Sequence, residues 1–299
     1  MKKAVYFALA ALLLGCALAG CSARQHSDSV QDLAPTPGIR RQELDFRNGD
    51  KKICGTMYFP GEEKKQCPAV ILSHGFGGTG NDNQLYAEKL AQLGYACYTF
   101  DFCGGGRSSK SDGTMTEMSV LTEKADLLAV MDGIEALDYI DTDNLFLFGE
   151  SQGGFVSSMA AAERASEVKG MVLLYPAYVL QDDCWKRHGS IDNVPQTEVI
   201  MGNTIGAVYS TDAMSFDIYD ILGGYSGPVY ILHGDEDKIV DVSYSERAVK
   251  TFPHAELEVL HGTGHGFFAR KDEAAELLAP WVLSHTDPAD FSSESEAEQ

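Results

Sequence analysis

Apolar and polar positions follow two different rhythms along the middle of the chain. Short, continuous apolar runs such as 69–73 are typical of strands that are buried on both faces of a sheet. Longer segments such as 120–139 place apolar residues at helical spacing. The predicted strands are 42–47, 52–59, 69–73, 95–101, 144–148, 170–175, 228–232 and 256–260. The predicted helices are 81–93, 120–139, 153–164, 243–251 and 273–283.

This alternation predicts an α/β fold with a mostly parallel eight-stranded sheet and helices on both faces. The turn Asn48-Gly49-Asp50 indicates a hairpin between the first two strands. The interval 181–227 is longer than a crossover between strands requires, so we expect a small cap insertion there. Such sheets bind ligands at the carboxyl ends of their strands, where the motifs described below are also found.

The first residues combine charge with a short apolar run. Lys2 and Lys3 precede the apolar segment 4–19, which is too short for a comfortable membrane span and is typical of a signal peptide. The segment ends in Leu-Ala-Gly-Cys, which resembles the bacterial lipoprotein signal, in which cleavage precedes a lipid-bearing cysteine. We therefore expect a signal peptide at 1–20 and lipidation of Cys21.

Two alternatives remain for this segment. Cys16 is a weaker candidate for lipidation because the bulky Leu14 precedes it by two residues. An ordinary cleaved leader with an incidental cysteine is also compatible with the sequence. The main expectation is an extracytoplasmic protein held on a bacterial membrane, at the cell surface or the periplasmic face.

Composition divides the remainder into three parts. Residues 21–40 are polar and read as a flexible tether, 41–284 as the folded domain, and the acidic segment 285–299 as a disordered tail. A hydrophobic content of 44% supports a sizeable core. The formal charge of −21 argues against nucleic-acid binding, which needs a basic surface. Nothing in the sequence indicates an oligomeric state.

Five cysteines lie beyond the expected lipidation site. They show no Cys-x-x-Cys or Cys/His spacing, so we expect no metal site. Their predicted role is that of small buried apolar residues, although one disulfide, for instance Cys54–Cys67, is possible in an oxidising compartment. The five are Cys54, Cys67, Cys97, Cys103 and Cys184.

Ser151 is the candidate nucleophile. It lies in Gly-Glu-Ser-Gln-Gly, between an apolar predicted strand and a predicted helix. A sharp turn in that context exposes the serine hydroxyl, and its small neighbours avoid clashes. The glycine-rich run His-Gly-Phe-Gly-Gly follows another strand. We expect the backbone N–H groups of Phe76 and Gln152 to form an oxyanion hole, and His74 to be structural.

The candidate acid and base follow the last two strands. Asp237 is the preferred carboxylate and Asp235 the second choice, in the run His-Gly-Asp-Glu-Asp. His265 lies in a glycine-flanked loop that would let it reach the serine, whereas His261 is closer to the strand and less free to move. The chain order Ser, Asp, His is that of α/β hydrolases.

Five motifs occur in order across roughly residues 41–283, namely HGFGG, DFCGGGRS, GESQGG, HGDEDKIV and GTGHGF. Together they resemble the α/β-hydrolase superfamily and, within it, the bacterial cinnamoyl/feruloyl esterases and the serine aminopeptidase S33-like (hydrolase 4) proteins. The resemblance implies the same roles for Ser151, Asp237 and His265, and for the N–H groups of Phe76 and Gln152. Glu150 departs from this branch, in which histidine or another residue often precedes the nucleophile.

We therefore expect a serine hydrolase that cleaves a carboxylic ester of short acyl or aryl (cinnamoyl) type through an acyl-enzyme, without a metal or organic cofactor. An S33- or S9-like peptidase stays open, because Glu150 or an acid of the insertion could bind a free amine. A third hypothesis is a non-catalytic, ligand-binding surface lipoprotein. The complete set of motifs argues against that hypothesis.

The insertion is rich in aromatic residues. An apolar, aromatic lid would suit acyl or aryl groups, and packing of the cap on the main domain is the alternative role for the same side chains. The residues concerned are Trp185, Tyr209, Phe216, Tyr219 and Tyr225.

Overall fold

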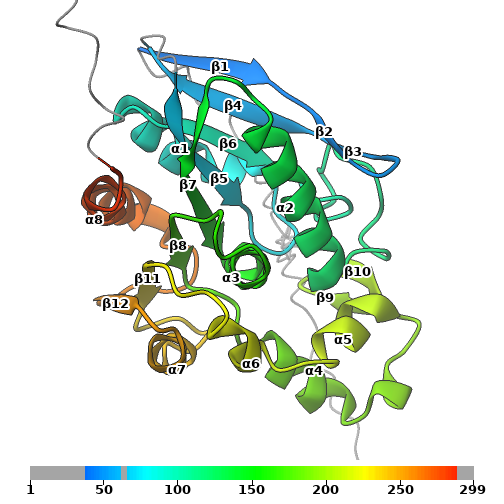
Figure 1. The fold of residues 1–299 in the computed structure, drawn as a ribbon. Helices are drawn as coiled ribbons and strands as arrows, with labels where there is room; N and C mark the ends of the chain where they lie inside the picture. Colours follow the sequence, from blue (N-terminus) through cyan, green and yellow to red (C-terminus); the bar gives the residue numbers. More distant parts are fainter. Residues whose placement is uncertain (1–37, 62–65, 288–299) are drawn as a thin grey trace, which may run out of the picture. The chain divides into compact units, whose positions relative to one another are not determined.

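The computed structural model describes residues 38–61 and 66–287. Its central feature is an eight-stranded sheet in the order β1-β4-β6-β5-β7-β8-β11-β12 (Figure 1). From β6 to β12 neighbouring strands run parallel, while β4 pairs antiparallel with both β1 and β6. The predicted fold class is confirmed. The strands are β1 (Ile39–Glu43), β4 (Gly55–Pro60), β5 (Cys67–Ser73), β6 (Ala96–Phe100), β7 (Ile140–Glu150), β8 (Gly170–Leu174), β11 (Val229–Gly234) and β12 (Ala255–Leu260).

Helices cover both faces of this sheet and create two apolar cores. One core packs α1 (Gln84–Gln92) and α8 (Lys271–Ser284) on the sheet. The other packs α2 (Val120–Glu135), α3 (Gln152–Glu163) and α7 (Ser243–Thr251) on the opposite face. Every residue of β5 is buried, as expected for a continuous apolar strand between two helical layers.

The predicted boundaries were wrong at the N-terminal edge and in the first long helix. The segment 42–47 is not one strand, because β1 ends at Glu43 and β2 (Phe46–Asn48) pairs instead with β3 (Lys51–Ile53). β1 also begins two residues inside the expected tether 21–40, since it pairs with β4. The helix expected at 120–139 ends at Glu135, where the chain turns to enter β7.

The insertion between β8 and β11 forms a cap of short elements. It contains α4 (Leu180–His188), β9 (Thr197–Ile200), β10 (Asn203–Gly206), α5 (Ala207–Ala213) and α6 (Ile218–Leu222). Figure 1 shows α4, α5 and the β9–β10 hairpin gathered near one end of α2, and α5 contacts α2. The guanidinium of Arg107 donates to the carbonyl of Gly202 at the hairpin turn. The described residues also include three short 3-10 helices, at Gly80–Asn83, Ile191–Asn193 and Phe268–Arg270.

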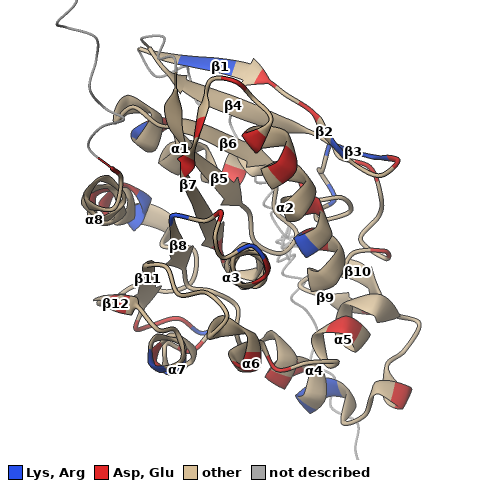
Figure 2. Ribbon diagram, in the orientation of Figure 1, with Lys and Arg blue, Asp and Glu red and all other residues tan. Residues whose placement is uncertain are grey.

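Asp and Glu are spread over the helices and loops, and Lys and Arg are fewer, in keeping with the charge of −21 (Figure 2). Within the described ranges, no helix is long and apolar enough to cross a membrane. The expected signal peptide 1–20 and the lipidation site Cys21 lie outside the described residues, as does most of the expected tail.

The five described cysteines form no disulfide with one another, so the possible Cys54–Cys67 bridge is absent. Burial was predicted correctly for four of them and wrongly for Cys54, which is only half-buried. The Cys54 thiol lies 3.1 Å from the carbonyl of Lys110. These cysteines therefore act as packing groups rather than as cross-links.

Candidate active site

Ser151 lies in a tight turn between β7 and α3. Its backbone has φ 51° and ψ −117°, a left-handed conformation that is costly for a residue with a side chain. The turn depends on close backbone contacts, because a Cβ atom on Gly153 would lie 2.3 Å from the carbonyl oxygen of Ser73. A Cβ on Gly149 would lie 2.4 Å from the carbonyl oxygen of Gly153. Only glycine allows β5, β7 and α3 to meet this closely.

The structure brings Ser151, His265 and Asp237 into one hydrogen-bonded chain. Ser151 Oγ lies 3.0 Å from His265 Nε2, and His265 Nδ1 lies 2.6 Å from Asp237 Oδ2. An ionised carboxylate only accepts hydrogen bonds, so Nδ1 carries the proton and Nε2 is free to accept from the serine hydroxyl. These residues come from the ends of β7, β12 and β11, as the motif positions predict.

Asp237 is held as a carboxylate by its partners. Burial alone would raise its pKa, but hydrogen bonds from His233, His265 and the N–H of Val240 lower the pKa well below its usual range. His233 Nε2 lies 2.9 Å from the carbonyl oxygen of Val240 and 3.3 Å from Asp237 Oδ2. Since both are acceptors, His233 must donate from Nε2. The carboxylate of Asp237 can therefore orient the His265 ring and stabilise the positive charge that a proton from serine would bring to it during catalysis.

Asp235 and His261, the less favoured acid and base candidates, form a pair with each other away from Ser151. His261 Nδ1 lies 2.7 Å from Asp235 Oδ2, on an imidazole that is 84% exposed. Neither residue lines the pocket that contains Ser151. His74 is buried and bridges the chain, since its Nε2 accepts from the N–H of Phe102 and its Nδ1 contacts the carbonyl of Gly75. This arrangement fits the structural role expected for His74.

The loop after β5 and the first turn of α3 lie next to Ser151, where an oxyanion hole is expected. A Cβ on Gly75 would lie 3.2 Å from Ser151 Cβ, so the loop after β5 runs directly over the nucleophile. Gln152 is the first residue of α3, where a helix leaves its N–H groups without intrahelical acceptors. Among the described residues, no acceptor contacts the N–H of Gln152 or of Phe76. Both groups are thus available to a ligand.

Tyr175 is a site residue that sequence reasoning missed. Its ring packs against that of His265 with 4.5 Å between centroids, and its hydroxyl donates to Glu150 Oε2 at 2.8 Å. Burial, reinforced by the charge of Glu150, raises the pKa of Tyr175 well above 10. The hydroxyl therefore stays protonated and fixes Glu150. The sequence signal was slight, namely a tyrosine at the end of the predicted strand 170–175.

A pocket of about 350 Å³ opens beside Ser151. Its apolar walls come from both the domain and the cap, and they include Ala177, Val179, Leu180, Ile200, Met201, Ile239, Val240 and Phe268. Ionisable side chains also line it, namely Asp82, Glu150, Asp183, Arg187 and Lys271. The pocket can hold an acyl or aryl group of moderate size next to the nucleophile.

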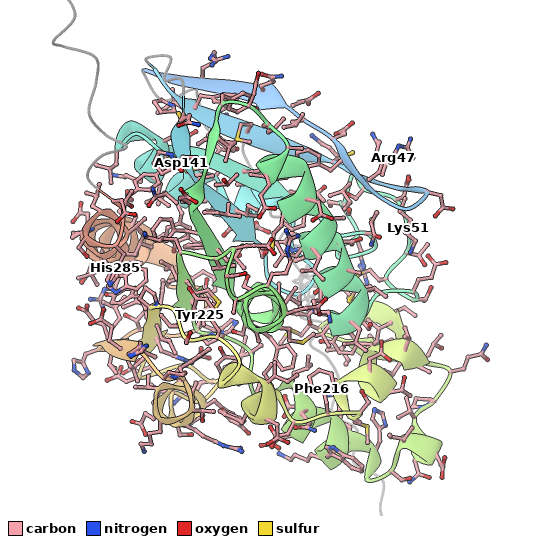
Figure 3. All side chains as sticks on the ribbon, in the orientation of Figure 1. Arg47, Lys51, Asp141, Phe216, Tyr225 and His285 are labelled. Carbon is pink, nitrogen blue, oxygen red and sulfur yellow. The ribbon has the colours of Figure 1, made fainter. Side chains whose placement is uncertain are left out.

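Of the aromatic residues in the insertion, only Tyr209 lines this pocket. Tyr219 and Tyr225 are buried in the core, and Phe216 packs on Phe155 with 6.1 Å between ring centroids (Figure 3). Trp185 is 40% exposed. Most of these residues therefore pack the cap onto the main domain, which was the alternative role predicted for them from the sequence.

Backbone strain is concentrated around the pocket. Within the described ranges, the non-glycine residues with positive φ are Ser151, Tyr175, Met201, Phe267 and Phe268, and all but Phe267 line the pocket. Phe268 is also 82% exposed and Met201 65% exposed. Within the same ranges, no group of three His, Cys, Asp or Glu side chains is arranged to hold a metal ion.

Comparison with known proteins agrees with this geometry. The family model of serine aminopeptidase S33 (Hydrolase_4) matches residues 64–202. Est1E from Butyrivibrio proteoclasticus, solved with ferulic acid bound, superimposes with a TM-score of 0.75 at 24% identity, covering 81% of this chain and 98% of that one. At this identity the likeness shows the fold.

Several relatives are named as lipases. The monoacylglycerol lipase of Mycolicibacterium smegmatis is 23% identical over 72% of this chain and 88% of its own length. The monoglyceride lipase of Rattus norvegicus is 25% identical, and the match spans half of each chain. The protein is therefore an α/β hydrolase by fold, and the resemblance to the Hydrolase_4 and feruloyl-esterase branch that the sequence predicted is confirmed.

Proposed function

We propose that the protein is a serine hydrolase that cleaves a carboxylic ester through an acyl-enzyme on Ser151. The observation that carries the proposal is the continuous hydrogen-bonded chain from Ser151 Oγ through His265 to Asp237, beside an apolar pocket. Relatives named as lipases support the same reaction class. The apolar walls favour a short acyl or an aryl acid, of the cinnamoyl type among others.

In the first half-reaction, Ser151 Oγ forms a bond to the ester carbonyl carbon while His265 Nε2 takes the serine proton. The carbonyl oxygen becomes an oxyanion, which the N–H groups of Phe76 and Gln152 would stabilise. The bond to the alcohol oxygen then breaks, and His265 returns its proton to that oxygen. Asp237 stabilises the imidazolium that exists between these two proton transfers.

In the second half-reaction, water replaces the alcohol. His265 removes a proton from the water, whose oxygen attacks the acyl carbon and forms a second oxyanion. Collapse of this intermediate breaks the bond to Ser151 Oγ, which regains a proton from His265. The products are a carboxylic acid and the free enzyme, and no cofactor is needed.

A peptidase is the second candidate function. The S33 family model and the carboxylates of Glu150 and Asp183 in the pocket favour it, because a carboxylate can bind the free amine of a peptide. Glu150, however, already accepts a hydrogen bond from Tyr175. Ester hydrolysis is therefore the function that the site supports better.

We further propose that the chain is anchored outside the cytoplasm through a lipid on Cys21. The support is sequence alone, namely two lysines, a short apolar run and Leu-Ala-Gly-Cys. A lipid anchor would hold the domain close to a bacterial membrane.

The test compares four substrates with the purified full chain, namely p-nitrophenyl acetate, p-nitrophenyl butyrate, methyl ferulate and an aminoacyl p-nitroanilide. We expect turnover of the esters that disappears in Ser151→Ala. Ser158→Ala is the matched control, because it removes a buried hydroxyl from α3, the helix that follows Ser151, where it contacts Tyr178 and the carbonyl of Gly154 rather than the pocket. Faster turnover of the anilide than of the esters would overturn the esterase proposal and support the peptidase function.

A further inference from the structure

Tyr209 connects the cap to both residues that would supply the oxyanion hole. It lies in α5 and is 3% exposed. Its hydroxyl donates to Gln152 Oε1 at 2.8 Å, and its ring packs against that of Phe76 with 5.4 Å between centroids. A single cap side chain therefore touches the residue on each side of the serine hydroxyl.

The side chain of Gln152 is held at its other end by α2. Gln152 Nε2 donates to Glu123 Oε2 at 2.8 Å, and both residues are buried. Tyr209 donates and Glu123 accepts, so the amide of Gln152 has one orientation that satisfies both partners. Gln152 is thereby stretched between the cap and the main domain.

This arrangement bears on the position of the backbone N–H of Gln152. That group is the first of α3 and follows Ser151, whose φ of 51° leaves the turn strained. A donor of this kind works only if its N–H points at the place where the oxyanion forms. Fixing the side chain restricts rotation of the Gln152 backbone, and the Tyr209 ring restricts Phe76 in the same way.

We propose that Tyr209 is a positioning residue that sets the oxyanion hole from the cap. The inference rests on the proposed serine hydrolase function and assigns the cap a part in the chemistry as well as in enclosing the substrate. The position of α5 against the main domain then determines how directly the N–H groups of Phe76 and Gln152 point at the oxyanion. A cap that shifts away from the domain would weaken the oxyanion hole even with Ser151, His265 and Asp237 in place.

Other buried tyrosines of the insertion lack this connection and provide a control. Tyr225 is fully buried, and its hydroxyl donates to the carbonyl of Val168 at 3.1 Å (Figure 3). Tyr225→Phe therefore removes one buried hydrogen bond, as Tyr209→Phe does, but leaves Phe76 and Gln152 untouched. The two variants separate loss of stability from loss of positioning.

The experiment measures kcat and KM for p-nitrophenyl acetate with the full chain and both variants. Acetate is small, so its binding depends little on the cap wall. Removing one oxyanion donor typically lowers turnover by ~10²–10³-fold, and Tyr209→Phe only displaces a donor. We therefore expect kcat to fall about tenfold to hundredfold with KM changed less than about twofold. Tyr225→Phe should keep the kcat of the unmodified chain.

Equal kcat values for Tyr209→Phe and Tyr225→Phe would overturn the inference while leaving the hydrolase proposal intact. If the unmodified chain cleaves no ester, the rate of fluorophosphonate labelling of Ser151 replaces turnover, since phosphonylation places an oxygen in the same hole. Slower labelling in Tyr209→Phe alone supports the positioning role whatever the natural substrate. No labelling of the unmodified chain overturns the hydrolase proposal and the inference together.

Discussion

Nε2 of the buried His233 lies 3.3 Å from Oδ2 of Asp237, the same oxygen that His265 contacts at 2.6 Å. The other carboxylate oxygen accepts from the N–H groups of Ile239 and Val240. Asp237 is therefore surrounded by donors only, and a negative charge is the state that satisfies all of them. This environment explains why Asp237, rather than Asp235, serves His265.

Asp237→Asn tests that environment. The amide must present an NH₂ group to some of these donors, so it would misorient His265 or force its other tautomer. We expect kcat to fall by roughly 10³–10⁴-fold while the chain stays folded. Ester turnover and far-ultraviolet circular dichroism measure the two properties. Asp235→Asn is the control, because Asp235 pairs with the exposed His261, and comparable losses in both variants would contradict the assignment.

Gly153→Ala tests the packing behind the nucleophile turn. The added Cβ would lie 2.3 Å from the carbonyl oxygen of Ser73 and 2.6 Å from that of His74, where backbone must move. Overpacking of this kind costs about 1–3 kcal/mol, so thermal unfolding should shift down by several degrees and ester turnover should fall. Gly223→Ala is matched to it, since its Cβ would meet nothing closer than 4.0 Å. Unchanged thermal stability and turnover in Gly153→Ala would contradict the close backbone packing at this turn.

Glu123 makes stability depend on pH. Burial raises its pKa from 4.5 to about 8, while the hydrogen bond from Gln152 opposes the shift. The folded state therefore holds a proton that the unfolded chain releases above pH 4.5. This contribution to stability is complete below pH 4.5 and is lost as pH rises to about 8.

Glu123→Gln removes that titration and keeps an oxygen that can accept from Gln152. Denaturant unfolding between pH 5 and pH 8 should show the difference in unfolding free energy between variant and unmodified chain changing steadily in favour of the variant. The nearby Asp126, whose pKa is also raised by burial and whose charge helps to raise that of Glu123, is present in both proteins. A difference independent of pH would mean that Glu123 is ionised throughout this range.

Lipidation of Cys21 is tested by phase separation. The full chain expressed in a bacterium should partition into the detergent phase, and Cys21→Ser should move it to the aqueous phase because a thioether-linked lipid can no longer form. Cys16→Ser, at the weaker candidate position, should leave partitioning unchanged. Loss of detergent partitioning in Cys16→Ser alone would reassign the anchor.

Residues that short local motifs identify could be predicted from the sequence, whereas contacts that depend on long-range packing could not. The positions of Ser151, Asp237 and His265 follow from short motifs that directly succeed apolar strands, and parallel strands bring their carboxyl ends together whatever the loops do. Tyr209 belongs to an insertion whose path no local pattern specifies, so its contact with Gln152 could not be derived. Glu123 did leave a signal, since it lies three residues after Val120, on the apolar face of its helix, where a buried acid needs a partner.

The strained residues around the pocket set stability and activity against each other. At Ser151, Tyr175, Met201, Phe267 and Phe268, glycine would adopt the observed backbone more easily than the residue present. A search for thermostable variants should therefore recover glycine at the two exposed positions, Met201 and Phe268. Such variants should bind substrate more weakly, because glycine removes a side chain that lines the pocket. At these two pocket positions a single substitution would therefore raise the thermal stability of the protein and lower its catalytic activity.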